Sequence, residues 1–315
     1  MNLRDSHLEL YTPIYDKFLL GTFAEYSQQC LEAFTPIEDQ TSEYKVDDLS
    51  GLGSWTFTEE GAAGDTEDPV LGYPKTYTPL KYTKTIQVSY EAVDDDEYAL
   101  LKRDTEAAQM GTGSRDRVER LTSTVLNGGF ASTTNSPDGQ FLWDTDHPKN
   151  REETGTTFSN LLSGAWSHDN LELAETQVTA NLFDLAGIPV PPTSTIKLFH
   201  PPSLRGPVKR VLSERAGERP GTANRDINRF VGAGTTYTYE PVEWIYLSAA
   251  SDFGGSNTAW YMIFKDFGYL KLIWRERPHY ASWRDDNLDI YNFKGRMRLA
   301  AGADNWRCGF ASTGL

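Results

Sequence analysis

The feature that most constrains the fold is an alternating run at residues 75–90, KTYTPLKYTKTIQVSY. From residue 80 onward its apolar residues share one parity, broken by Lys84: Leu80, Tyr82, Ile86, Val88 and Tyr90. This period of two is typical of a half-buried strand. SWTFT at 54–58 predicts a first strand, and the glycine- and acid-rich segment between the two predicts a mobile tip. We therefore expect a long hairpin whose polar tip reaches outside its own domain.

A long helix is predicted directly after this run. Asp94, Asp95, Asp96 and Glu97 place negative charge where a helix begins, and apolar residues at helical spacing continue to Leu126. The glycines of MGTGS at 110–114 are expected to weaken or kink the helix, and Asn127 with two glycines ends it.

The rest of the chain mixes helix and strand. Asp169 with Glu172 resembles a capping pair for a helix running to Leu185, and the strand STIKLFHPP follows. The C-terminal third contains a series of short apolar and aromatic segments separated by turn residues, which predicts β-strands. The fold class is therefore α+β.

The net charge of −15 is concentrated in the first hundred residues, which hold 20 acidic and 6 basic side chains, whereas the remainder holds 25 and 24. No dense Lys/Arg stripe is present, which argues against sequence-specific nucleic-acid binding. We find no apolar leader and no apolar run of about 20 residues, so we expect a soluble, cytosolic protein with no membrane contact. Cys30 and Cys308 are expected to be reduced.

FLWDTDHPKN at 141–150 has two interpretations. Asp144, Asp146 and His147 are metal-ligand types, and His168 with Asp169 is the nearest source of another ligand. Alternatively, D-T-D-H-P is a turn, because Asp bonds nearby backbone and the residue before proline leaves the helical region. The turn interpretation predicts backbone N–H bonds to Asp144 or Asp146, and a His147 ring held by Pro148 and the aromatics Phe141 and Trp143.

A second stretch, WRERPHYASWRDD at 274–286, interleaves aromatic and basic side chains in a pattern that can stack nucleic-acid bases. Because two aspartates follow, we interpret it instead as strand aromatics in a core with arginines at the rim. His200 and His279 are likewise interpreted as structural.

The order of these motifs resembles that of tailed-phage major capsid proteins. The resemblance rests on an acidic arm, a long hairpin and a spine helix ending in LNGG, followed by FLWDTDHP, TGTTFSNLLSGAWSHDNLELA, IKLFHPP, EWIYLSA with AWYMIF, and the closing KGRMRLAAGADNWRCGFASTG. The Mu-like major head subunits, which have the HK97-type capsid fold, are the most similar group. The resemblance implies an N-terminal arm at 1–53, an extended hairpin loop at 54–88, a peripheral domain with a spine helix at 89–165, an axial domain at 166–290, and a C-terminal return to the peripheral domain at 291–315.

The resemblance also implies a function. The chain would assemble with itself, as hexamers and pentamers, into the icosahedral shell of a tailed phage, made in the host bacterial cytoplasm. Partners would be a separate scaffolding protein, a portal, a decoration protein and non-specifically contacted double-stranded DNA. No catalysis, cofactor or metal is expected. Residues expected at contacts between subunits, in the arm and the hairpin, are Phe18, Phe23, Trp55, Phe57, Glu60, Asp65, Asp68, Tyr73, Lys75 and Tyr77.

Two alternatives stay open. One is the shell subunit of an encapsulin-like nanocompartment, which shares the fold. The other is a metal-dependent hydrolase built on Asp144, Asp146 and His147.

Overall fold

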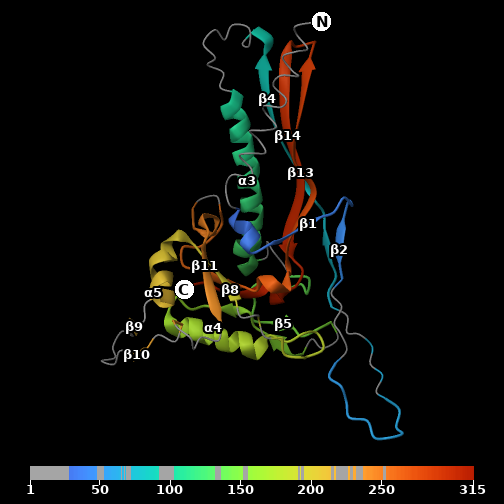
Figure 1. The fold of residues 1–315 in the computed structure, drawn as a ribbon, viewed down its shortest axis with the longest axis vertical. Helices are drawn as coiled ribbons and strands as arrows, with labels where there is room; N and C mark the ends of the chain where they lie inside the picture. The colour runs from blue at the N-terminus through green and yellow to red at the C-terminus, as the bar shows by residue number, and fades with distance from the viewer. Residues whose placement is uncertain are drawn as a thin grey trace.

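The computed structural model (Figure 1) describes residues 28–47, 53–64, 66, 68, 72–91, 103–131, 136–151, 155–190, 192, 195–213, 216–217, 226–227, 230–231, 237–250 and 253–315. Two β-sheets dominate this part of the chain, and one long helix lies between them and beside the larger sheet. The mixture of helix and strand confirms the α+β class.

The longer sheet has four strands in the order β1-β13-β14-β4. They are β1 (Thr35–Glu38), β13 (Leu270–Asp285), β14 (Ile290–Ala303) and β4 (Leu80–Ser89). β13 and β14 form an antiparallel hairpin, β4 adds antiparallel to β14, and β1 adds parallel to β13. The alternating run of the sequence is thus an edge strand, and its partner lies about two hundred residues further along the chain.

The second sheet has five strands in the order β11-β8-β12-β15-β7. They are β11 (Thr238–Glu243), β8 (Thr195–His200), β12 (Trp260–Ile263), β15 (Gly309–Ser312) and β7 (Leu161–Leu162). Every residue of β12 and β15 is buried. Apolar residues of α4 (His168–Asn181) and α5 (Arg205–Ser213) share one core cluster with β8 and β12. The cap of α4 differs from the expected Asp169–Glu172 pair, because the Ser167 side chain accepts the N–H of Asn170.

Short elements complete the described chain. The remaining strands are β2 (Tyr44–Val46), β3 (Lys75–Tyr77), β5 (His147–Pro148), β6 (Thr157–Phe158), β9 (Ala216–Gly217) and β10 (Asp226–Ile227). The 3-10 turns are η1 (Gln29–Glu32), η2 (Gly128–Phe130), η3 (Pro202–Leu204), η4 (Ile245–Leu247), η5 (Lys265–Phe267) and η6 (Trp306–Cys308). Among the described helices, none is long and apolar enough to cross a bilayer.

Helix α3 (Arg103–Asn127) connects the two sheets. Val118, Val125 and Leu126 are buried in the core cluster that also holds strand residues of the long sheet. The same cluster holds Phe199, Tyr261 and Ala311 of the second sheet. Two hydrogen bonds add to it on that side: the Trp244 indole donates to Glu119 at 2.7 Å, and the Tyr246 hydroxyl donates to Asp116 at 2.9 Å. The helix continues through the glycines at 111 and 113, and its expected beginning at residue 94 lies outside the described residues.

The strand pairing corrects the expected hairpin. SWTFT forms no strand, and β3 pairs instead with β2, so the loop that this hairpin encloses is residues 47–74. The second half of the alternating run, β4, belongs to the long sheet. The boundary expected between the axial domain and the C-terminal return, at residue 290, falls between β13 and β14, which form one hairpin. The last strand, β15, lies in the five-stranded sheet. Local alternation predicted β4, but neither its partner β14 nor the true partner of β3, which is β2.

Candidate functional site

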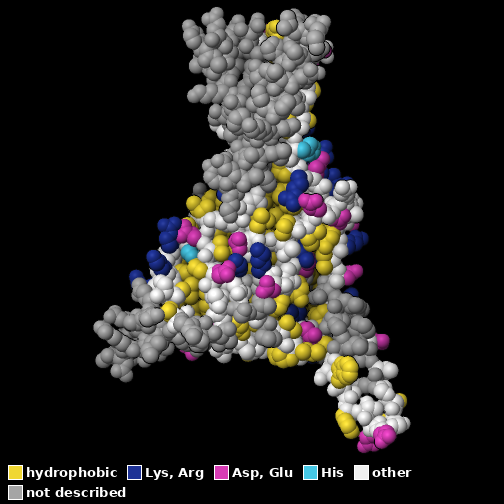
Figure 2. Space-filling model, in the orientation of Figure 1, with side chains coloured by type: hydrophobic (Ala, Val, Ile, Leu, Met, Phe, Trp, Pro, Cys, Tyr) yellow, Lys and Arg dark blue, Asp and Glu magenta, His cyan; other side chains and the backbone are white. Residues whose placement is uncertain are grey.

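The loop at 47–74 projects from the body of the subunit (Figure 1). Trp55 is 99% exposed and Phe57 is 91% exposed, and Figure 2 shows hydrophobic and acidic side chains together at the far end of the loop. Residues 46–74 contain seven acidic side chains and no Lys or Arg. Large apolar side chains so fully exposed mark an interaction surface.

The expected contact residues in the arm and the hairpin divide into three groups. Glu60 and Asp68 are exposed, like Trp55 and Phe57. Phe18, Phe23 and Asp65 lie outside the described residues. Tyr73, Lys75 and Tyr77 alternate along the base of the loop, where Tyr77 is buried and the other two are half-buried against the subunit's own body.

Tyr77 anchors the base of the loop. Its side chain is buried, and its hydroxyl donates to Asp304 Oδ1 at 2.5 Å. A Cβ at Gly302 would lie 2.6 Å from Tyr77 Cε1, so the ring can occupy this position only because residue 302 is glycine. The Tyr73 hydroxyl donates to the Asn150 carbonyl at 3.4 Å. Burial lowers the pKa of the Lys75 ammonium, although the nearby Asp304 carboxylate acts to raise it. These three side chains fix the direction in which the loop leaves the body.

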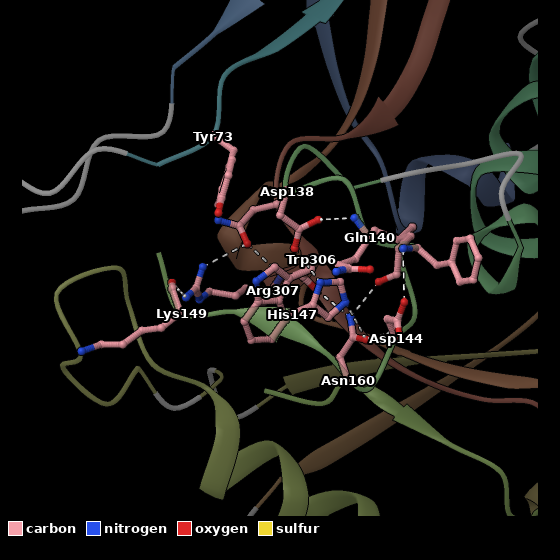
Figure 3. A network of polar contacts seen from close by, with 12 residues as sticks. Tyr73, Asp138, Gln140, Asp144, His147, Lys149, Asn160, Trp306 and Arg307 are labelled. Atoms are coloured by element: carbon pink, nitrogen blue, oxygen red, sulfur yellow. Dashed lines mark hydrogen bonds and ion pairs between the residues drawn. The ribbon is translucent and has the colours of Figure 1, made fainter. Parts of the chain in front are cut away.

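A buried polar network lies next to this base (Figure 3). His147 Nδ1 is 2.7 Å from Asp138 Oδ2, and Nε2 is 3.2 Å from Asn160 Oδ1. The ring stacks on Trp306, with 4.8 Å between centroids and 9° between planes. The ring was expected to be held by Phe141 and Trp143. Instead, Phe141 is partly exposed, and the Trp143 indole donates to the Leu126 carbonyl. That part of the turn interpretation is wrong.

Asn160 organises the network. Its amide nitrogen donates to the carbonyls of Leu142 and Trp306, which fixes the orientation of the amide. Its Oδ1 therefore faces the Asp144 N–H, at 2.9 Å, and the His147 ring. The loop around residue 144 and the end of the chain around residue 306 are thus joined through one side chain.

Asp144 behaves as turn chemistry predicts. Its carboxylate accepts the N–H of Thr145 at 2.7 Å and the N–H of Phe141 at 3.4 Å. Asp146 is exposed, and His168 begins α4, where its ring lies against Phe230. In the described part of the chain, no three His, Cys, Asp or Glu side chains converge as a metal site would require. The bonds around Asp144 and His147 hold three chain segments together.

Arg307 completes the network. It is buried, lies over the Trp306 ring, and donates to the main-chain carbonyls of Phe183 and Lys149. Sequence reasoning missed Asp138, Asn160, Trp306 and Arg307. The family resemblance gave the one signal for them, since its motifs TGTTFSNLLSGAWSHDNLELA and the closing NWRC segment contain Asn160, Trp306 and Arg307.

Comparison with known proteins gives the fold a family. A family described as phage capsid protein matches residues 72–312. No curated protein sequence matches the chain significantly. Among solved structures, the capsid of the cyanophage P-SCSP1u has a TM-score of 0.58 at 11% identity, covering 89% of this chain and 86% of that one. The mature capsid of bacteriophage PhiM1 has a TM-score of 0.58 at 12% identity, covering 91% and 87%.

A virus-like particle from Pyrococcus furiosus is also similar, with a TM-score of 0.51 at 12% identity, covering 96% of this chain and 99% of that one. At these identities the structural likeness shows the fold, and the family match shows the kind of protein. The match at 72–312 spans well over half of the sequence. The chain therefore belongs to the phage capsid protein family, has the HK97-like α+β fold, and is a shell subunit.

Proposed function

We propose that this chain is the major head protein of a tailed phage of the Mu-like group, and that its loop at 47–74 lies on a neighbouring subunit in an icosahedral shell of hexamers and pentamers. The observation that carries the proposal is the exposure of Trp55 and Phe57 on an anchored, projecting loop. Burying one such side chain contributes about 1.5–3 kcal/mol. That gain is available only if another molecule covers them.

Weak contacts suffice in such an assembly. Each subunit of a closed shell contacts several others, so modest pairwise affinities combine through effective concentration. The arm at 1–53, which the buried Cys30 and Phe34 anchor in its own subunit, would add a second contact to a neighbour. The acidic balance of the chain supports non-specific enclosure of double-stranded DNA without tight adhesion.

The described sheets suggest how the domains divide. α3 and the long sheet correspond to the peripheral domain, and the five-stranded sheet with α4 and α5 corresponds to the axial domain. Scaffolding is proposed to be a separate chain, and a portal and a decoration protein are proposed as further partners in the virion. Synthesis is proposed to occur in the cytoplasm of the host bacterium.

The test replaces Glu60–Gly72 with a short Gly/Ser turn. This change leaves β2, β3 and Tyr77 in place, so the subunit should keep its circular dichroism spectrum and melting temperature. Electron microscopy should show the loss of closed particles that the parent forms. A second variant, Trp55→Ser with Phe57→Ser, keeps the loop length and should show the same loss. If both variants form shells as stable as the parent's, the loop does not bridge subunits.

A further inference from the structure

Lys84 interrupts the core between α3 and the long sheet. It has the parity of Tyr82, the β4 residue over which Arg117 of α3 lies, and it pairs with Gly295 of β14. On β14, Met297 on one side of this glycine packs in the main core cluster, and Phe293 on the other side packs in a separate small cluster. A cation and a glycine thus lie where continuous packing would place two apolar side chains.

A cavity of about 340 Å³ lies at this interruption, between β4, β13, β14 and α3, and Figure 1 shows α3 running beside the long sheet. Two buried methionines line the cavity, Met110 from α3 and Met297 from β14. Small-molecule sites in proteins have such volumes, and most are apolar with a few polar groups that fix the ligand. The size and lining of this cavity match that description.

Gly113 keeps the cavity open on the side of α3. A Cβ at this residue would meet no described atom within 4 Å, so no neighbour in the described subunit requires a glycine there. A glycine inside a helix lowers stability relative to alanine. Gly113 therefore costs helix stability for a reason other than packing within the described subunit.

The lining of the cavity carries uncompensated positive charge. Lys84 is exposed and has no carboxylate partner among the described residues. The Arg117 guanidinium lies 4.5 Å from the centre of the Tyr82 ring and donates to its hydroxyl at 3.2 Å, and it too has no carboxylate partner in that part of the chain. Asp116 is the only acid among the described lining residues, and its carboxylate already accepts from Arg120 at 2.7 Å. An anion in the cavity therefore meets two cations.

We propose that this cavity binds a single-chain aliphatic carboxylate, of the fatty-acid class. The alkyl chain packs against Met110 and Met297, and the carboxylate faces Lys84 and Arg117. Methionine is unbranched and polarizable, so its side chain adapts to the shape of a flexible alkyl chain. Because the ligand touches α3 and β14 at once, its binding stabilises the packing of the helix on the sheet.

Other ligand classes use this lining less completely. Tyr82 is the only Phe, Tyr or Trp among the described lining residues, and Arg117 already lies over its ring, so a flat aromatic ligand finds little surface for stacking. Inorganic phosphate pairs with the cations but leaves both methionines uncovered. Duplex DNA is too wide to enter the cavity and reaches only its rim.

A series of carboxylates measures the contribution of the alkyl chain. The full-length protein is titrated with hexanoate, octanoate and decanoate in an isothermal calorimeter. One buried CH₂ strengthens binding about fourfold, so each step of two carbons should lower the dissociation constant about fifteenfold. Inorganic phosphate should not displace decanoate.

Lys84→Met measures the contribution of charge. Decanoate should bind this variant about fivefold more weakly than the parent, whereas octanol, which has no charge, should bind within about twofold of the parent. Lys81→Met makes the same change on an exposed lysine of β4 outside the cavity lining, and this control should bind decanoate like the parent.

Gly113→Leu fills the cavity from the side of α3. This variant should bind neither decanoate nor octanol, and its melting temperature should be at least that of the parent. A second measurement does not depend on the folding of this variant: decanoate with a diazirine at its terminal carbon should, on irradiation of the parent, label Met110 or Met297, which mass spectrometry of the digested protein identifies.

Three results would overturn the proposal. If the label lies on other residues, or a folded Gly113→Leu variant binds decanoate like the parent, the ligand site is elsewhere. If Lys84→Met binds decanoate as tightly as the parent, the cavity takes a neutral apolar ligand and the carboxylate is wrongly assigned. If phosphate displaces decanoate, the site recognises a different class of anion. None of these measurements depends on shell formation, so the proposed function is tested separately.

Discussion

His147 lies between two hydrogen-bond acceptors, and this decides what it can do. Because the Asn160 amide nitrogen is committed to two carbonyls, the ring nitrogens face the Asp138 carboxylate and an amide oxygen. The network therefore engages both ring nitrogens. These contacts, with the stacking on Trp306, hold the loop around residue 147 in one geometry.

Removing one partner of the Asp138–His147 pair should be costly. Asp138→Ala leaves a buried imidazole nitrogen without its partner, and we expect a loss of about 1–3 kcal/mol in the free energy of unfolding, measured with urea. Asp146→Ala removes an exposed carboxylate two residues before Pro148 and should change it by less than about 0.5 kcal/mol. Equal effects of the two changes would contradict the role given to Asp138.

Glu119 offers a pH-dependent test at the same scale. Burial raises the pKa of this carboxyl above 4.5, against the opposing effect of its bond from Trp244. The folded state therefore binds the Glu119 proton more tightly than the unfolded state does. The stabilisation that this tighter proton binding gives the fold is full below pH 4.5, and it is lost as the pH rises through the folded pKa of Glu119.

Glu119→Gln removes that dependence and keeps an oxygen for Trp244. Relative to the parent, the variant should become more stable as the pH rises from about 5 to 7.5, by up to about 1.4 kcal/mol for each unit by which the pKa is raised. Urea unfolding at both pH values measures the difference. A difference between variant and parent that does not change with pH would show that Glu119 is not the titrating group.

At the scale of elements, the base of the loop depends on close packing between β3 and β14. Gly302→Ala places a methyl group 2.6 Å from Tyr77 Cε1, so the ring or the strand must move. We expect a loss of about 1–3 kcal/mol and faster cleavage of the loop by a protease. Tyr77→Phe should also loosen the base, because it leaves the buried Asp304 carboxylate without that donor.

Gly113 provides the matched control. A Cβ there meets nothing within 4 Å, and the residue lies inside α3, so Gly113→Ala should stabilise the chain by about 0.5–1 kcal/mol. If both glycine changes have the same sign, packing against Tyr77 is not what constrains residue 302.

Element types were predictable from local pattern, whereas partners were not. The alternation at 80–90 gave β4 and the acid-started helical spacing gave α3, because burial periodicity is encoded within each segment. The pairing of β3 with β2 was missed, since three-residue strands carry almost no period. The same limit applies to the network: Trp306 stacks on His147 across 159 residues of sequence, and no local spacing predicts that contact.

For the molecule as a whole, assembly is the decisive property. We expect the purified protein, with or without a separate scaffold, to form closed shells, tubes or capsomer rings that electron microscopy can resolve. Assembly should also slow proteolysis of the loop relative to free subunits, since the loop would then be covered. A monodisperse 35.4 kDa species at high concentration, even with scaffold supplied, would contradict this expectation.

The way the sheets are closed also bears on when a subunit becomes competent during translation. β1 and β4 pair with β13 and β14, and β7 pairs with β15, so early strands in both sheets wait for partners that leave the ribosome much later. Such non-local pairing forms late. A nascent chain that still lacks β13 to β15 therefore offers neighbours no finished sheet, and we expect fragments from synthesis interrupted before these strands to stay out of the lattice.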